Sequence, residues 1–164
     1  MKKIIVSFLM LSLIVSAGFA ATAPKVTAKP AATGSSNGLR VGFIASTPTV
    51  KFNINENMNM QVGLGLSSSS GSSTFGIVVA GGSKIAKVSG NDIYTGSRLN
   101  YSSSSGSSSF TIAWDLGVDV MLNSALEVGL YISPISYSST SFGGASSTSF
   151  SILSGGVISA HLYI

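Results

Sequence analysis

The chain has 164 residues, of which 45% are hydrophobic and only 9% are charged, and it contains no cysteine. The lack of cysteine excludes a disulfide framework and a thiolate metal site. The formal net charge of +4 comes from basic residues that are scattered along the sequence, so we expect no nucleic-acid partner.

Two N-terminal segments are predicted to precede the folded domain. Residues 1–20 combine a basic start, an apolar stretch at Ile4–Val15 and small residues near their end, which is the pattern of a cleaved signal peptide. The alternative is an uncleaved anchor helix, for which the apolar stretch is short. Residues 21–37 are rich in Ala, Thr, Pro, Lys and Ser and predict a flexible lead-in to one domain at residues 38–164.

Eight segments of this domain alternate apolar and polar residues with a period of two, as strands with one apolar face do. The clearest is Phe110–Leu122, which is longer than the roughly 5–6 residues usual for strands in soluble proteins. In chain order, the predicted strands are Leu39–Ser46, Thr49–Asn55, Met58–Leu66, Thr74–Val88, Ile93–Tyr101, Phe110–Leu122, Ala125–Tyr137 and Ser149–Ile164.

The predicted connections fall into two classes that alternate along the chain. Ser-rich links follow the third, fifth and seventh strands, and Leu66–Phe75 and Tyr101–Phe110 repeat one pattern. Tight turns follow the second, fourth and sixth strands, at residues 55–57, 89–92 and 123–124, and a short turn is predicted at 47–48 after the first strand. In an up-and-down sheet the Ser-rich links and the tight turns lie at opposite ends, so we expect longer loops at one end and short turns at the other. A pair of glycines, Gly81-Gly82, is interpreted as a bulge in the fourth strand.

These features predict an all-β fold: an eight-stranded antiparallel up-and-down transmembrane β-barrel, apolar outside and polar inside. Aromatic residues on the outward face, next to the Ser-rich links, are expected to mark a lipid boundary. The predicted aromatic girdle consists of Phe75, Tyr101, Phe110 and Phe150.

Opposite charges on the inward face predict an ion-pair network. Eight strands leave an interior that side chains fill, and buried charges are stable only when they are paired. If the link between the fifth and sixth strands is symmetric, Arg98 lies beside Asp115. Asp119 and Glu127 then lie close together and need a cation, for which Arg40 is a candidate. The predicted structural lumen charges are Arg40, Lys51, Arg98, Asp115, Asp119 and Glu127.

No catalytic, cofactor or metal site is predicted, and we expect the protein not to be an enzyme. The inward carboxylates have an alternative interpretation as an acid/base pair or a cation path, but a charge-neutral interior favours a structural role. His161, the one histidine, is interpreted as a rim or core residue. A hydrolase triad needs the histidine beside a serine and a carboxylate, and the spacing of residues along the chain does not imply that geometry.

The signal-peptide pattern and alternating segments such as Met58–Leu66 (MNMQVGLGL) resemble the small outer-membrane β-barrel proteins of Gram-negative bacteria, the OmpX/OmpW-like superfamily. The chain departs from that pattern at Ile164, where such proteins usually have an aromatic residue. The resemblance implies a porin-like membrane protein of the cell outer membrane, inserted by the barrel-assembly machinery. It further implies a monomer in contact with outer-membrane lipid, without a cofactor, and with a surface or envelope-structural role.

Two other functions are kept as alternatives. The first is an outer-membrane lipid-modifying enzyme or a narrow channel for small hydrophobic solutes. The second is a secreted Ser/Gly-rich β-protein that assembles with itself.

Overall fold

The structure, a computed structural model, describes residues 38–69 and 72–164. The predicted signal peptide at 1–20 and lead-in at 21–37 lie outside the described residues. Within the described ranges no helix is long and apolar enough to cross a membrane. The strands are β1 (Arg40–Ile44), β2 (Thr47–Asn55), β3 (Met58–Ser69), β4 (Ser72–Val88), β5 (Asn91–Ser104), β6 (Ser107–Met121), β7 (Leu126–Phe142), β8 (Ala145–Ile152) and β9 (Gly156–Tyr163).

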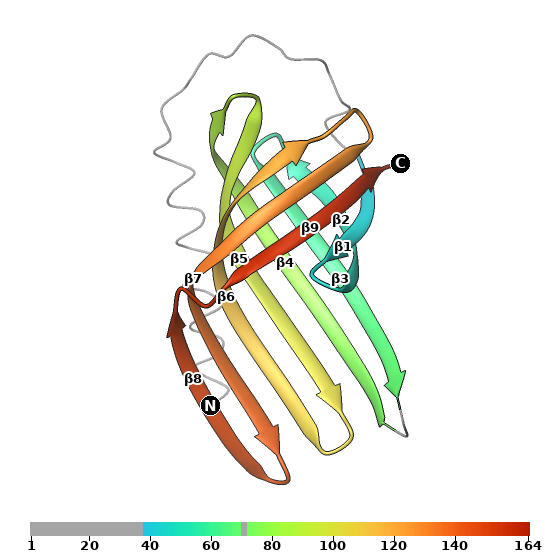
Figure 1. The fold of residues 1–164 in the computed structure, drawn as a ribbon, viewed down its shortest axis with the longest axis vertical. Coiled ribbons are helices and arrows are strands. Elements are labelled where there is room, and N and C mark those ends of the chain that lie inside the picture. The colour runs from blue at the N-terminus through green and yellow to red at the C-terminus, as the bar shows by residue number, and fades with distance from the viewer. Residues whose placement is uncertain (1–37, 70–71) are drawn as a thin grey trace.

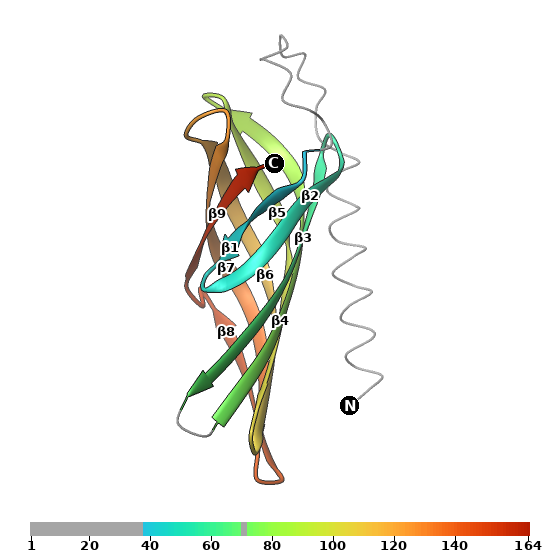
Figure 2. The ribbon, with the colours of Figure 1, turned by 90° about the vertical axis from the view of Figure 1, so that its right-hand side faces the viewer.

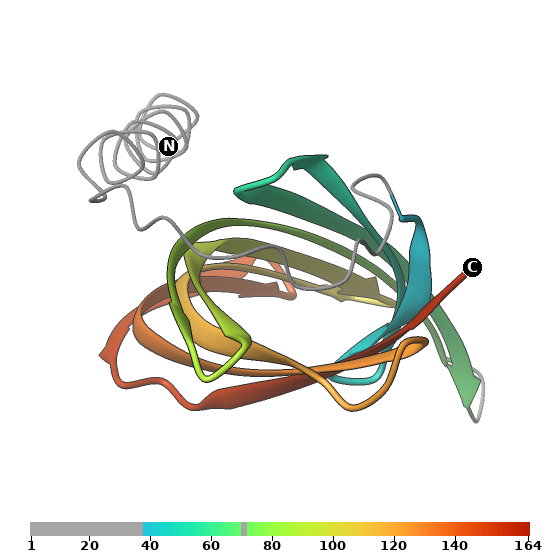
Figure 3. The ribbon, with the colours of Figure 1, turned by 90° about the horizontal axis from the view of Figure 1, so that it is seen from above.

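These strands form one closed antiparallel barrel (Figure 1 and, from above, Figure 3). Consecutive strands pair from β1 to β7, and the circuit closes because β7 pairs with β9 and β9 pairs with β1. β8 and β9 pair with successive parts of the same edge of β7, so together they fill the eighth position. The predicted all-β, eight-stranded antiparallel barrel is confirmed.

The predicted last strand, Ser149–Ile164, is divided into β8 and β9 by a three-residue break. Leu153 and Gly155 in this break have positive φ angles of 56° and 118°. The N–H groups of Leu153 and the next residue still donate to the carbonyls of Pro134 and Ser133, with N···O distances of 2.8 and 3.0 Å. Pro134 has no N–H to donate in return, and a regular ladder cannot continue through it. The break is therefore a bulge in one edge, not a gap.

The Ser-rich links, predicted as loops, are strands in the structure. β5 continues to Ser104 and β6 begins at Ser107, joined by the two-residue turn Ser105-Gly106, in which Gly106 has a φ of 82°. The hydroxyls of Ser104 and Ser107 are hydrogen-bonded across the turn at 2.7 Å. Cross-strand hydroxyl pairs of this kind stabilise a sheet. For the links that the structure describes in full, the expectation of longer loops is therefore wrong, because two-residue turns at 105–106 and 143–144 join the strands.

The bulge predicted at Gly81-Gly82 lies further along β4. Both glycines pair with β3 in unbroken register, and the register shift in β4 falls between Lys84 and Ala86. A Cβ atom on Gly96 of β5 would overlap the carbonyl oxygen of Gly81. Small residues at this point therefore allow close approach of β4 and β5.

The β1–β2 hairpin is shorter than the other hairpins. β1 ends at Ile44 and the chain turns at residues 45–46, where Ala45 has a φ of 53°, so the turn predicted at 47–48 belongs to β2. Beyond this hairpin, β3 to β8 continue as an open sheet, seen in the lower part of Figures 1 and 2. We call this sheet the extension; its described residues are 65–69, 72–76, 100–111 and 135–152.

Candidate functional site

We call the rest of the barrel, outside the extension, the closed half. Its interior is polar, whereas much of its outer surface is apolar. Lys51 and His161 are fully buried, at 0% exposure, while Leu64 and Leu130 on the outer face are 59% and 49% exposed. This distribution is the reverse of that in a water-soluble domain. Among the predicted lumen charges, the structure buries Arg40, Lys51, Asp115, Asp119 and Glu127 and half-buries Arg98.

Lys51 of β2 is the centre of the largest ion-pair cluster. Its Nζ lies 2.6 Å from Asp119 Oδ2 and 2.6 Å from Glu127 Oε1. Arg40 Nη1 lies 3.1 Å from the other oxygen of Glu127. The Lys51 ammonium also lies over the ring of Tyr94, 5.7 Å from its centroid. Two cations thus meet two carboxylates in a charge-neutral group, as buried charges require.

The cation between the two carboxylates is therefore Lys51, and the candidate Arg40 contacts only one of them. Arg40 is held by other partners: its Nη2 donates to Asn53 Oδ1 at 3.0 Å, and its guanidinium lies 4.5 Å from the centroid of the Tyr163 ring. The Tyr131 hydroxyl donates to Asp119. These contacts fix Arg40 and Asp119 against neighbouring strands, whereas Lys51 meets its partners across the lumen.

Arg98 and Asp115 form a second cluster nearer the extension. Arg98 Nε lies 2.7 Å from Asp115 Oδ2, and Nη2 lies 3.2 Å from Oδ1. Ser133, which the sequence did not single out, donates to Asp115 Oδ1 at 2.6 Å and accepts from Arg98 Nη2 at 3.0 Å. The β6–β7 register shifts between Trp114 and Leu116, so two residues of β7 oppose Asp115. This bulge brings the Ser133 hydroxyl to the carboxylate.

His161 is buried beside Thr49 and does not contact a carboxylate. Its Nε2 lies 3.0 Å from Thr49 Oγ1, and its Nδ1 has no hydrogen-bond partner among the described residues. In a hydrolase triad a carboxylate orients the histidine through the ring nitrogen that does not face the nucleophile. The His161 geometry in the described chain lacks that contact. Nor do three His, Asp or Glu side chains gather as metal ligands anywhere in residues 38–69 and 72–164.

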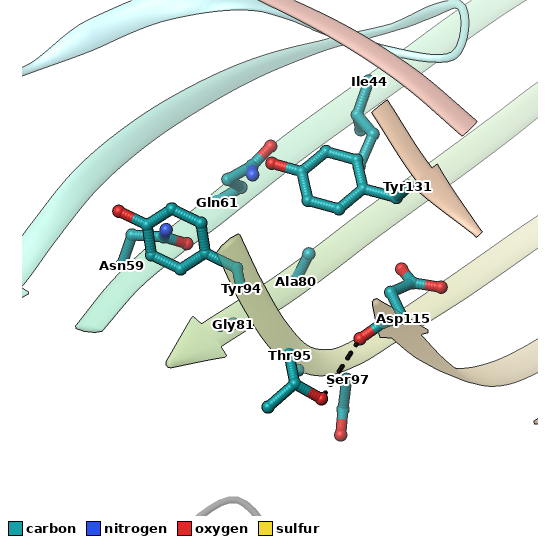
Figure 4. A pocket seen from close by; sticks show the side chains of 12 residues that line it. Ile44, Asn59, Gln61, Ala80, Gly81, Tyr94, Thr95, Ser97, Asp115 and Tyr131 are labelled. Atoms are coloured by element: carbon teal, nitrogen blue, oxygen red, sulfur yellow. Dashed lines mark hydrogen bonds between the residues drawn. The ribbon is translucent and has the colours of Figure 1, made fainter. Parts of the chain in front are cut away.

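A small cavity lies between the two clusters (Figure 4). Its volume is about 20 Å³, which is room for a single water molecule. Thr95, beside it, donates to the carbonyl of Asp115 at 3.4 Å, the contact drawn in Figure 4. The cavity is lined by side chains of Asn59, Gln61, Tyr94, Asp115, Tyr131 and Ile44, among others.

The four predicted girdle residues lie on the outward face, and two further residues extend their row. The pairs Leu66↔Phe75, Tyr101↔Phe110 and Tyr137↔Phe150 are register partners in three successive hairpins. Each of these six residues is the last large apolar outward residue of its strand before the Ser-rich tip, which is the end of the hairpin that a Ser-rich link forms. We call this row of six residues the girdle line. Leu66 was not predicted because it is not aromatic, and the aromatic Tyr137 was missed.

The girdle line steps by two residues from one hairpin to the next. Tyr101 is opposite Ile77, two residues beyond Phe75, and Tyr137 is opposite Ile112, two residues beyond Phe110. Strands of a barrel tilt by about 35–45° from its axis, so a level line around the barrel must step through the register in this way. The six residues therefore lie at a similar height along the barrel axis.

The fold and the interior together define the class: a closed eight-stranded antiparallel β-barrel with a filled, charge-paired interior and an apolar outer face. Comparison with known proteins finds no matching family model, no matching curated protein and no matching solved structure. The class therefore rests on the geometry of this chain.

Proposed function

We propose that the protein is an integral β-barrel of the bacterial outer membrane, of the OmpX/OmpW-like kind, with a non-enzymatic surface or envelope-structural role. The observation that carries the proposal is the apolar outer face around a polar, ion-paired interior. In a bilayer each backbone polar group needs a partner within the protein, which a closed barrel supplies. The apolar side chains of the outer face can then contact lipid instead of water.

The girdle line supports a lipid boundary at the base of the Ser-rich tips. Aromatic side chains favour the interface between lipid and water. From Phe110 to Met121, β6 is long enough to cross a bilayer, for which about 9–11 tilted residues suffice. Serine hydroxyls beyond the girdle line suit an aqueous surface.

The interior favours a structural role over catalysis or transport. The lumen charges are paired with one another, and the cavity between them has room for one water. Networks of paired charges of this kind hold a scaffold together.

The first test is membrane fractionation of the full chain. We expect the protein in the outer-membrane fraction after an alkaline wash, with a folded form that migrates differently from the boiled form on a gel. A protein that remains soluble without detergent would contradict the proposal.

The second test uses Trp114, the chain's single tryptophan, as a depth probe. Its ring faces outward and is 39% exposed, and its Nε1 donates to Thr95 Oγ1 at 2.8 Å, so the polar group is satisfied away from water. In vesicles of phosphatidylcholine brominated on the acyl chains we expect strong quenching of its fluorescence. The matched control, Trp114→Phe with Ser108→Trp at a Ser-rich tip, should be quenched by aqueous acrylamide instead.

A further inference from the structure

The extension has two strand edges that nothing among the described residues pairs. β2 covers the edge of β3 as far as the pair Thr49↔Gly63, so the edge from Gly65 to Ser69 is free. β8 pairs only with β7, so its second edge is free along Ala145–Ile152. Figure 1 shows these two edges on opposite sides of the open sheet.

Neither edge carries the features that prevent strand addition. Natural sheets protect free edges with charged residues, proline or bulges. The extension contains no Asp, Glu, Lys, Arg or Pro in any of its six strands. Its edges therefore offer regular, uncharged backbone to another strand.

Both edges reach the height of the girdle line. Leu66 of β3 is 83% exposed, and Phe150 and Ile152 of β8 are 61% and 74% exposed. If this height lies in lipid, unpaired backbone groups there have neither water nor a neighbouring strand as partner, which is strongly unfavourable. A partner strand would remove that cost.

The two edges of one copy are held apart by the closed half. There, β2 and β1 lie between β3 and β9. Strands are spaced by about 4.8 Å, so three intervals separate the edges by about 14 Å where they leave the closed half. Pairing within one copy would have to bridge this distance.

The directions of the edges fit pairing between copies. β3 runs toward the Ser-rich tips and β8 runs away from them, since each forms one side of a hairpin at that end. Two barrels with parallel axes therefore bring β3 of one copy and β8 of the other together antiparallel, as in every pair of this fold. Contacts of β3 with β3, or of β8 with β8, would be parallel in that arrangement.

The faces of the edges also match. In β3, Leu66 faces outward and Ser67 inward; in β8, Phe150 and Ile152 face outward and Ser151 inward. Antiparallel pairing joins apolar side chains on one face and hydroxyls on the other.

We propose that the free edge of β8 in one copy adds to the free edge of β3 in a second copy. This inference rests on the proposed function, because one membrane aligns the barrel axes. The interface is head-to-tail and leaves one free edge of each kind, so association continues into rows.

The test is cross-linking between two single-cysteine variants of the full chain, which has no cysteine of its own. Ser68→Cys on β3 and Ser146→Cys on β8, which both face outward and carry tags of different size, are reconstituted together in vesicles with a short bismaleimide. We expect a heterodimer at least fivefold more abundant than in the matched control, where Ser108→Cys on central strand β6 replaces Ser146→Cys. Equal yields would overturn the proposal.

A single chain that carries both cysteines shows whether the free edge pairs with a second copy, with the same copy or with another protein. We expect a ladder of dimers, trimers and larger species. A cross-linked monomer alone, meaning closure of β3 on β8 within one copy, would overturn the proposal. Cross-linking in cells only to a protein of another mass would do so as well.

A charge placed on the edge gives a second readout. Thr148→Lys on β8 should reduce the ladder at least fivefold. Ser139→Lys puts the same charge on its register partner in β7, one strand from the edge, and should leave the ladder unchanged. Heat-modifiable migration of the same samples separates the two proposals: a folded, membrane-embedded monomer contradicts only the pairing, whereas a soluble protein contradicts the membrane position.

Discussion

At the scale of single residues, Lys51 is the side chain on which the interior depends most. Its ammonium is fully buried and lies between Asp119 and Glu127, and Arg40 contacts only Glu127. Removal of one partner of a buried ion pair is far more costly than replacement of the whole pair, because the remaining charge has no solvent.

We expect Lys51→Met to lower the free energy of unfolding by about 3–5 kcal/mol. The measurement is urea-induced unfolding in detergent, followed through the fluorescence of Trp114. Lys51→Met combined with Asp119→Asn restores the charge balance and should regain much of that loss. A single variant as stable as the natural chain would show that the cluster is not stabilised by Lys51.

The two ion clusters differ in how far the sequence could predict them. Arg98 and Asp115 lie in one hairpin, so its register brings them together. Lys51 is on β2 and its partners on β6 and β7, and they meet only because the barrel closes. Distances across a lumen depend on curvature and strand tilt, and residue alternation carries no information about either.

At the scale of elements, glycines let bulky groups occupy the inside of the barrel. A Cβ atom on Gly117 of β6 would overlap the Tyr131 ring and lie 2.6 Å from the carbonyl oxygen of Leu130. A Cβ atom on Gly65 of β3 would meet nothing closer than Thr47 Cγ2 at 3.7 Å, an ordinary contact.

We therefore expect Gly117→Ala to lower the free energy of unfolding by about 1–3 kcal/mol, since a backbone oxygen cannot move aside without loss of strand pairing. Gly65→Ala, the matched control, should change it by less than about 0.5 kcal/mol. Urea unfolding of both variants under the same conditions is the measurement. Equal losses in the two would contradict the steric explanation.

Strands with an apolar face could be predicted, but the Ser-rich tips could not. In Phe110–Leu122 the alternation itself marks the faces. At Ser102–Ser109 both faces carry serine, so no period is visible, and the hairpin forms through paired hydroxyls and the turn glycine. The Ser-Gly dipeptide at 105–106 was the one local signal for that turn.

At the scale of the whole molecule, side chains fill the cross-section of the barrel interior. The Lys51 cluster, the aromatic rings beside it and the Arg98 cluster occupy successive levels, with space for about one water between them. An eight-stranded barrel has room for side chains but not for a wide channel.

We expect no stepwise conductance from the natural chain in planar lipid bilayers. Lys51→Ala with Asp119→Ala and Glu127→Ala removes most of one level and should give a small, measurable leak of ions. The volume-matched control, Lys51→Met with Asp119→Asn and Glu127→Gln, should remain closed. Porin-like steps from the natural chain would contradict a filled lumen.

The short seam between β1 and β9 has a consequence for the order of folding. It consists of five residue pairs, from Arg40↔Tyr163 to Ile44↔Ser159, and it joins the two ends of the domain. Every other pairing links strands that follow one another, with β8 and β9 counted as one, and such local hairpins form early because they close short loops. We therefore expect the seam to form last, because it closes the longest loop of any strand pairing in the barrel.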